Sequence, residues 1–193
     1  MDYPIYEIVI DETGELGMGY MSIVDKPAIE SNFLMFSEHL KYAVNDERRV
    51  ITGPAIIADK PIYREINGQP CYTVFTVPVI EKIVKKWAAN QNYSLVNTQH
   101  SDPVNGIHLF ESYIIDRERG LNPPKEFSDI SNGSWFVSYY VTNDELWQEI
   151  KDGQFKGFSI EINADLQKTD YSELHEFIRE VNEFLANYDK TNT

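Results

Sequence analysis

The chain has 193 residues, of which 42% are hydrophobic and 13% aromatic, enough to build the core of one folded domain. Its formal net charge of −14, from 17 basic and 31 acidic residues, argues against nucleic-acid and membrane-surface partners, which need basic footprints. The single cysteine, Cys71, excludes an internal disulfide, and the four histidines are scattered. We therefore expect no metal, no cofactor, no nucleic acid and no membrane association.

The chain order predicts a lead-in segment followed by the main domain. Residues 1–48 are expected to form an N-terminal strand and an arm, because apolar and polar residues alternate over residues 3–10 and Pro27 lies in the mixed stretch behind them. Residues 49–165 combine short strands with two helical segments, and they are expected to form the core of the protein.

Two helices are predicted within this core segment. The first runs from about Pro78 to Ala89, where apolar residues recur at helical spacing behind a proline suited to a first turn. The second begins at Thr142, whose spacing to Glu145 is that of a capping box, and it ends before Gly153. We expect this second helix to pack the strand that follows it into place.

Residues 166–193 predict a C-terminal amphipathic helix. Between Tyr171 and Asn187 the apolar residues follow the i, i+3, i+4, i+7 spacing of one helical face. This helix either packs on the core or serves in assembly, as a dimerisation or scaffold-docking element.

The strand after the second helix carries a candidate nucleophile. Apolar and polar residues alternate from Phe158 to Asn163, which sends the two sets to opposite faces of a strand. Ser159 and Glu161 therefore share the polar face. A hydroxyl on a rigid strand can be positioned accurately for attack, although an ordinary solvent-facing serine gives the same pattern.

A candidate general base lies earlier in the chain. His100 follows an alternating segment, Tyr93 to Gln99, at the start of a turn-rich stretch. Histidine is the usual base for a serine nucleophile because imidazole titrates near neutral pH. A surface or capping histidine is the simpler interpretation of the same position.

His100 and Ser159 belong to a series of short segments that follow one another in a fixed order along the chain. Together they resemble the XkdF-like family of phage and prophage serine proteases, within the prohead (procapsid maturation) proteases. The segments that carry the resemblance are Ile23–Ile29, Val50–Ala55, Asp59–Arg64, Gln99–Asp102, Gly106, Glu111–Ile115, Gly133–Ser138, Asn143–Trp147, Ile150–Gly153 and Lys156–Glu161.

The resemblance implies a fold and an activity. The implied fold is α+β, a herpesvirus-protease-like closed or nearly closed β-barrel flanked by helices. The implied activity is a serine endopeptidase that cleaves phage scaffold and major capsid proteins, alone or as a homo-oligomer. It would act in the host cytoplasm, inside the assembling prohead, with Ser159 as nucleophile and His100 as base.

Glu111 is the first candidate for the third catalytic residue. On a regular strand over residues 107–115 it shares a face with four apolar or aromatic residues, where a carboxylate is costly to bury unless it is paired. A short turn at residues 102–106 would pair this strand with the His100 segment. Glu161, on the Ser159 face, is the second candidate, and His175 is the third, because herpesvirus proteases use a second histidine after the serine.

The sequence is also compatible with a second function. In that alternative the same barrel is a non-catalytic structural or scaffold-binding module of a phage head or tail, and Ser159 and His100 are bystanders. In a protease, the Ser159 hydroxyl and a His100 ring nitrogen are expected to approach hydrogen-bonding range.

Overall fold

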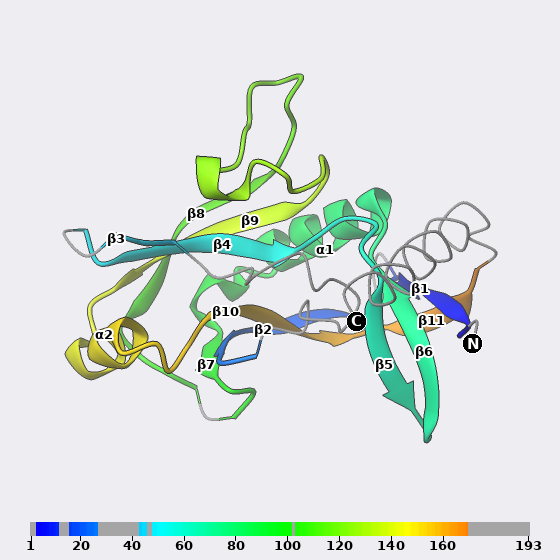
Figure 1. Ribbon diagram of the computed structural model, residues 1–193, viewed down its shortest axis with the longest axis horizontal. Coiled ribbons are helices and arrows are strands. Elements are labelled where there is room, and N and C mark those ends of the chain that lie inside the picture. The colour runs from blue at the N-terminus through cyan, green and yellow to red at the C-terminus, as the bar shows by residue number, and fades with distance from the viewer. Residues whose placement is uncertain (1–2, 12–15, 27–42, 46–47, 102, 170–193) are drawn as a thin grey trace, which may run out of the picture.

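The computed structural model describes residues 3–11, 16–26, 43–45, 48–101 and 103–169 (Figure 1). The predicted helix over residues 171–187, with His175, lies outside the described residues. The strands are β1 Ile5–Val9, β2 Gly17–Val24, β3 Ala43–Asn45, β4 Val50–Ile56, β5 Ile62–Ile66, β6 Gln69–Val74, β7 Val96–Thr98, β8 Ile107–Ile114, β9 Trp135–Val141, β10 Gly157–Asn163 and β11 Asp165–Lys168. The helices are α1 Val77–Ala89 and α2 Asp144–Lys151, with 3-10 turns η1 Asn92–Ser94 and η2 Lys125–Phe127.

These strands form three sheets. Their orders are β11-β1-β6-β5, β10-β2-β7 and β3-β4-β9-β8. Figure 1 shows the third sheet over the second, with the first sheet at one end and α2 at the other. The N-terminal strands are part of these sheets, because β1 pairs with β6 and β11 while β2 pairs with β7 and β10.

The expected closed or nearly closed barrel is wrong. Closure gives every strand two hydrogen-bonded neighbours, whereas each described sheet ends on edge strands such as β5 and β10. Bulges shift the register between Glu161 and Ile162 in β10 and between Pro54 and Ile56 in β4. Pro54 also lacks the backbone N–H that a second ladder would use. The described chain is mostly β with two α-helices, so the α+β description is only partly consistent with it.

Helix α1 confirms the first predicted helix. It buries Ile80, Ile83 and Trp87, and the Trp87 ring meets the ring of Trp135 edge-on at a centroid distance of 5.1 Å. Since Trp135 belongs to β9, this contact holds the helix against the third sheet. None of the helices that the structure describes is both long and apolar enough to traverse a bilayer.

Helix α2 confirms the second predicted helix but not its cap. Asn143 is the N-cap, since its side-chain oxygen accepts a hydrogen bond from the Leu146 N–H at 3.0 Å. The predicted capping box from Thr142 to Glu145 is wrong, because the Thr142 hydroxyl donates to the Gly106 carbonyl at 3.2 Å instead. The buried face of α2 belongs to the same core cluster as Phe158 of β10. The element that α2 mainly contacts is β9, so direct packing of this helix on β10 stays a prediction.

Candidate functional site

Three polar residues form a row across the β10-β2-β7 sheet. Ser159 is paired with Ser22 in the antiparallel ladder, and Ser22 is paired with Asn97 in the parallel one. Paired residues direct their side chains to the same face of a sheet, so the three side chains are neighbours. Ser159 is only 4% exposed, and the other two are still more buried. Ser159 is therefore not an ordinary solvent-facing serine.

An unusual turn brings His100 to this row. Gln99 and His100 follow β7 with φ angles of 52° and 55°, a left-handed backbone that costs non-glycine residues ~1–3 kcal/mol each. The turn is held by the Gln99 N–H, which donates to the Ile23 carbonyl at 3.0 Å, and by the Ser101 N–H, which donates to Thr98 at 3.0 Å. It directs the His100 ring back over the face that carries Ser22.

Four side chains then close a hydrogen-bonded network, which we call the polar cluster: Ser22, Asn97, His100 and Glu161. Ser22 Oγ lies 2.6 Å from Asn97 Oδ1 and 2.9 Å from His100 Nδ1. Asn97 Nδ2 donates to Glu161 Oε1 at 2.5 Å. The same carboxylate oxygen lies 3.2 Å from His100 Nδ1 and 3.2 Å from Ser22 Oγ. Three sheet strands and one turn thus fix the imidazole ring.

The contacts in this cluster favour one tautomer of His100. The Ser22 hydroxyl has one proton, and its shortest contact directs that proton to Asn97 Oδ1. If Ser22 Oγ and the Glu161 carboxylate both accept from Nδ1, these contacts favour the tautomer that carries its proton on Nδ1. The lone pair is left on Nε2. An imidazole whose Nδ1–H is held by a carboxylate is the arrangement of a general base.

The cluster also keeps Glu161 ionised. Burial alone would raise the pKa of this carboxyl, but the hydrogen bonds from Asn97, His100 and Ser22 outweigh burial and hold its pKa below the ordinary value. The carboxylate is therefore charged throughout the range in which a histidine base works.

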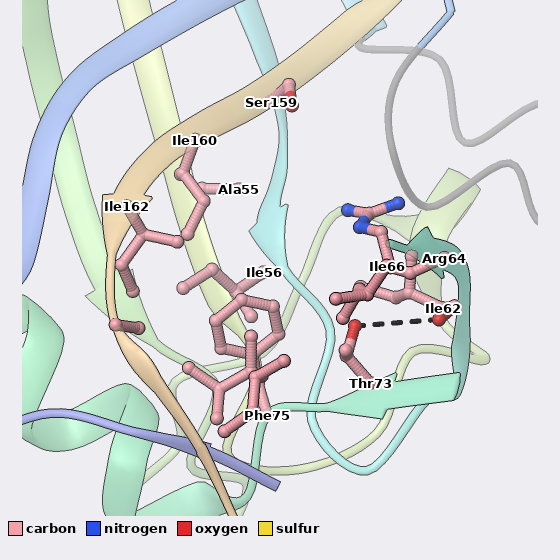
Figure 2. Close-up of a pocket in the computed structure, with 13 residues that line it drawn as sticks. Ala55, Ile56, Ile62, Arg64, Ile66, Thr73, Phe75, Ser159, Ile160 and Ile162 are labelled. Atoms are coloured by element: carbon pink, nitrogen blue, oxygen red, sulfur yellow. Dashed lines mark hydrogen bonds between the residues drawn. The ribbon is translucent and has the colours of Figure 1, made fainter. Parts of the chain in front are cut away.

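Ser159 lies beside the polar cluster rather than inside it. Among the described residues, the His100 ring bonds with Ser22 and Glu161, and no Ser159–His100 hydrogen bond is formed. Residues paired across an antiparallel ladder have Cα atoms ~4.5–5.5 Å apart, so Ser159 is the direct neighbour of Ser22. Ser159 also lines a cavity of about 220 Å³ (Figure 2).

The structure does not bring Glu111 to His100. The expected pairing of its strand with the His100 segment is wrong, because β8 pairs with β9 while β7 pairs with β2. A bulge between Leu109 and Glu111 also breaks the regular alternation. Glu111 is exposed and accepts a hydrogen bond from Ser138 Oγ at 2.6 Å. Glu161, the second candidate in the sequence, is the carboxylate that contacts His100.

Sequence reasoning missed Ser22 and Asn97. A signal for Ser22 exists, because a small polar residue stands between Met21 and Ile23 in an otherwise apolar strand. Its role depends on strand partners that lie 75 and 139 positions away, Asn97 and Glu161. Alternation predicts which face a residue occupies, but it does not predict which strands become neighbours.

The described residues offer no metal-type ligand set. No group of three or more His, Cys, Asp or Glu side chains comes together in the part of the chain that the structure describes. The polar cluster itself contributes one histidine and one carboxylate, flanked by a hydroxyl and an amide. Its chemistry is that of proton transfer and hydrogen bonding.

Comparison with known proteins places the chain in a family. Residues 43–168 match the family described as "Putative phage serine protease XkdF". No curated protein and no solved structure matches the chain. The matched range covers more than half of the chain and contains His100, Ser159 and Glu161, whereas Ser22 precedes it. The chain therefore belongs to the XkdF family of phage serine proteases.

Proposed function

We propose that this protein is a serine endopeptidase in which Ser159 is the nucleophile, His100 the general base and Glu161 the residue that orients the base. Its substrates are the scaffold and major capsid proteins of its phage, cut inside the assembling prohead during head maturation. The observation that carries the proposal is the 3.2 Å contact between Glu161 Oε1 and His100 Nδ1, in a chain of a phage serine protease family.

The tautomer supports Ser159 over Ser22 as nucleophile. Ser22 contacts Nδ1, the nitrogen that carries the proton, so it donates nothing to the base there. Ser22 is also 0% exposed, and its hydroxyl is bound by Asn97, which leaves no approach for a peptide carbonyl. Ser159 lines a cavity and has no side-chain hydrogen bond to another described residue, which favours it over Ser22 as the serine that a substrate reaches.

The reaction then follows the acyl-transfer sequence of serine hydrolases. Ser159 Oγ attacks the scissile carbonyl carbon while its proton moves to His100 Nε2, and the resulting imidazolium is stabilised by ionised Glu161. The imidazolium gives that proton to the leaving amine, and the peptide C–N bond breaks to form an acyl-enzyme. A water molecule, deprotonated by His100 in turn, releases the second product and restores Ser159.

Ser22 and Asn97 act on this reaction through the ring. Ser22 shares the Nδ1–H with Glu161, and Asn97 holds both Ser22 and Glu161 in place. Because both residues are almost fully buried, they fix the ring with little freedom. A ring that stays in one orientation loses less entropy when the transition state forms.

The substrate assignment is tested with the phage's own proteins. The chain, its Ser159→Ala variant and its Ser22→Ala variant are each incubated with scaffold and major capsid protein, and the products are sized by mass spectrometry. We expect cleavage by wild type and none by Ser159→Ala. Cleavage at wild-type rate by Ser159→Ala would refute Ser159 as nucleophile, and no cleavage by any form would favour a non-catalytic structural or scaffold-binding module.

A further inference from the structure

The cavity beside Ser159 has a mostly apolar wall. It lies between β10, β4 and the β5-β6 hairpin, and its volume of about 220 Å³ exceeds the ~150 Å³ that accommodates benzene in a protein interior. One substrate side chain therefore fits. Apolar side chains from several strands form most of the wall, among them Ile56, Ile62, Phe75, Ile160 and Ile162 (Figure 2).

Arg64 places one positive charge in this apolar wall. Arg64 lies between Ile62 and Ile66 at every second position of β5, so the three side chains share one strand face. All three line the cavity. In Figure 2 the guanidinium lies on the Ser159 side of the aliphatic cluster. Its polar contact is a bond from Nη1 to the Tyr63 carbonyl at 3.1 Å.

The Arg64 guanidinium has no carboxylate partner among the described residues, in a protein that carries 31 acidic residues. Burial lowers the pKa of this guanidinium, which means that the charged form has lost part of its hydration. A partly desolvated cation is stabilised most by an anion that binds it with two parallel hydrogen bonds. No carboxylate of the residues that the structure describes takes that place.

We propose that this cavity is the specificity pocket of the protease and binds a glutamate side chain of the substrate next to the scissile bond. The methylene stem of glutamate packs on the aliphatic wall, and its carboxylate pairs with Arg64 across from Ser159. This inference rests on the proposed function, because it takes Ser159 as the residue that attacks the neighbouring carbonyl. It adds a substrate class that the family match does not give.

The test compares peptides that differ at one position. Cleavage sites are first mapped on a mixed peptide library, and kcat/KM is then measured on matched peptides with Glu, Gln or Lys at the enriched position. We expect wild type to prefer Glu over Gln by at least ~10-fold, the usual worth of a charge-assisted bond in a partly dry site. Arg64→Gln is expected to abolish this preference, and Arg64→Glu to favour Lys.

A matched charge change elsewhere provides the control. Lys85→Glu alters net charge as Arg64→Glu does, on an exposed face of α1 outside the cavity, and it is expected to keep the preference for Glu. An equal loss in Lys85→Glu would reduce the effect to long-range charge and overturn the pocket assignment. A wild type that shows no preference for acidic side chains would also overturn the pocket assignment. Arg64 variants that change only self-association would overturn it too, because inward-pointing charges on edge strands such as β5 also prevent aggregation.

Failure of the proposed function has a different signature. A fluorophosphonate probe, which is uncharged and reacts with activated serine hydroxyls, reports Ser159 reactivity without any peptide side chain. If wild type labels at Ser159 but shows no preference for Glu, only the pocket inference falls. If wild type does not label at Ser159, the nucleophile assignment falls, and the pocket inference falls with it.

Discussion

Replacing Glu161 with Gln keeps the shape of the polar cluster and removes its charge. At the 3.2 Å separation from His100 Nδ1, Coulomb's law gives ~1.3 kcal/mol in bulk water and ~5 kcal/mol at the effective dielectric constant of ~20 near a protein surface. The two side chains are 42% and 37% exposed, so solvent screens part of this attraction. We expect the transition state to lose ~2–3 kcal/mol, which corresponds to ~30- to 150-fold in kcat/KM.

The assay measures the rate of Ser159 labelling by a fluorophosphonate probe together with scaffold cleavage. Glu111→Gln is the matched control, because Glu111 lies on another sheet and bonds with Ser138. We expect this control to react at the wild-type rate. Glu161 does not orient His100 if Glu161→Gln folds and reacts like wild type, or if Glu111→Gln shows the larger loss.

Four further predictions concern the polar cluster and its support. Because hydrogen bonds hold the folded-state pKa of Glu161 below its ordinary value of 4.5, the ionised carboxylate stabilises the fold above that pH, and this contribution is lost as pH falls through the lowered pKa. The stability difference between wild type and Glu161→Gln, measured by urea unfolding, is therefore expected to shrink from roughly pH 6 to roughly pH 3, and a constant difference would contradict it. Ser22→Ala is expected to cost about 1–3 kcal/mol in urea unfolding, since it leaves buried partners unsatisfied, and to slow Ser159 labelling without abolishing it; complete loss in a folded variant would instead mark Ser22 as the nucleophile. Gly106→Ala is expected to lower the free energy of unfolding by about 1–3 kcal/mol, because φ is 76° there and an added Cβ would stand 2.8 Å from Asn143 Cβ. An unchanged melting temperature would show that the loop backbone shifts to accommodate the added Cβ. Phe158→Ala is expected to lose about 3–5 kcal/mol, since its 2%-exposed ring packs on Tyr139, and a loss under ~1 kcal/mol would mean that the core collapses around the site.

Local patterns in the sequence predicted several elements correctly. The alternation from Phe158 to Asn163 predicts β10, and helical spacing predicts α1 and α2. These signals are local, since they depend on residues within one or two turns or on one strand. They also predict that Ser159 and Glu161 share a strand face, which agrees with the contacts of Glu161 to Ser22, the strand partner of Ser159.

Long-range pairing and irregular backbone account for what the sequence did not predict. The choice of Glu111 assumed that β8 lies beside the His100 segment and continues without a bulge, and both assumptions fail. Two consecutive left-handed residues, Gln99 and His100, turn the imidazole toward Ser22, and neither is a glycine that would mark the turn. The barrel expectation failed for a related reason, because bulges and Pro54 interrupt ladders that local alternation presents as continuous.

The residue that a fluorophosphonate probe labels covalently shows directly whether Ser159 is the nucleophile. Wild type, Ser159→Ala, Ser22→Ala and His100→Ala are treated with the probe, and the modified residue is identified by peptide mass spectrometry. We expect one adduct on Ser159 in wild type, a slower adduct at the same residue in Ser22→Ala, and none in Ser159→Ala or His100→Ala. An adduct on Ser22, or labelling of Ser159 at full rate without His100, would contradict it.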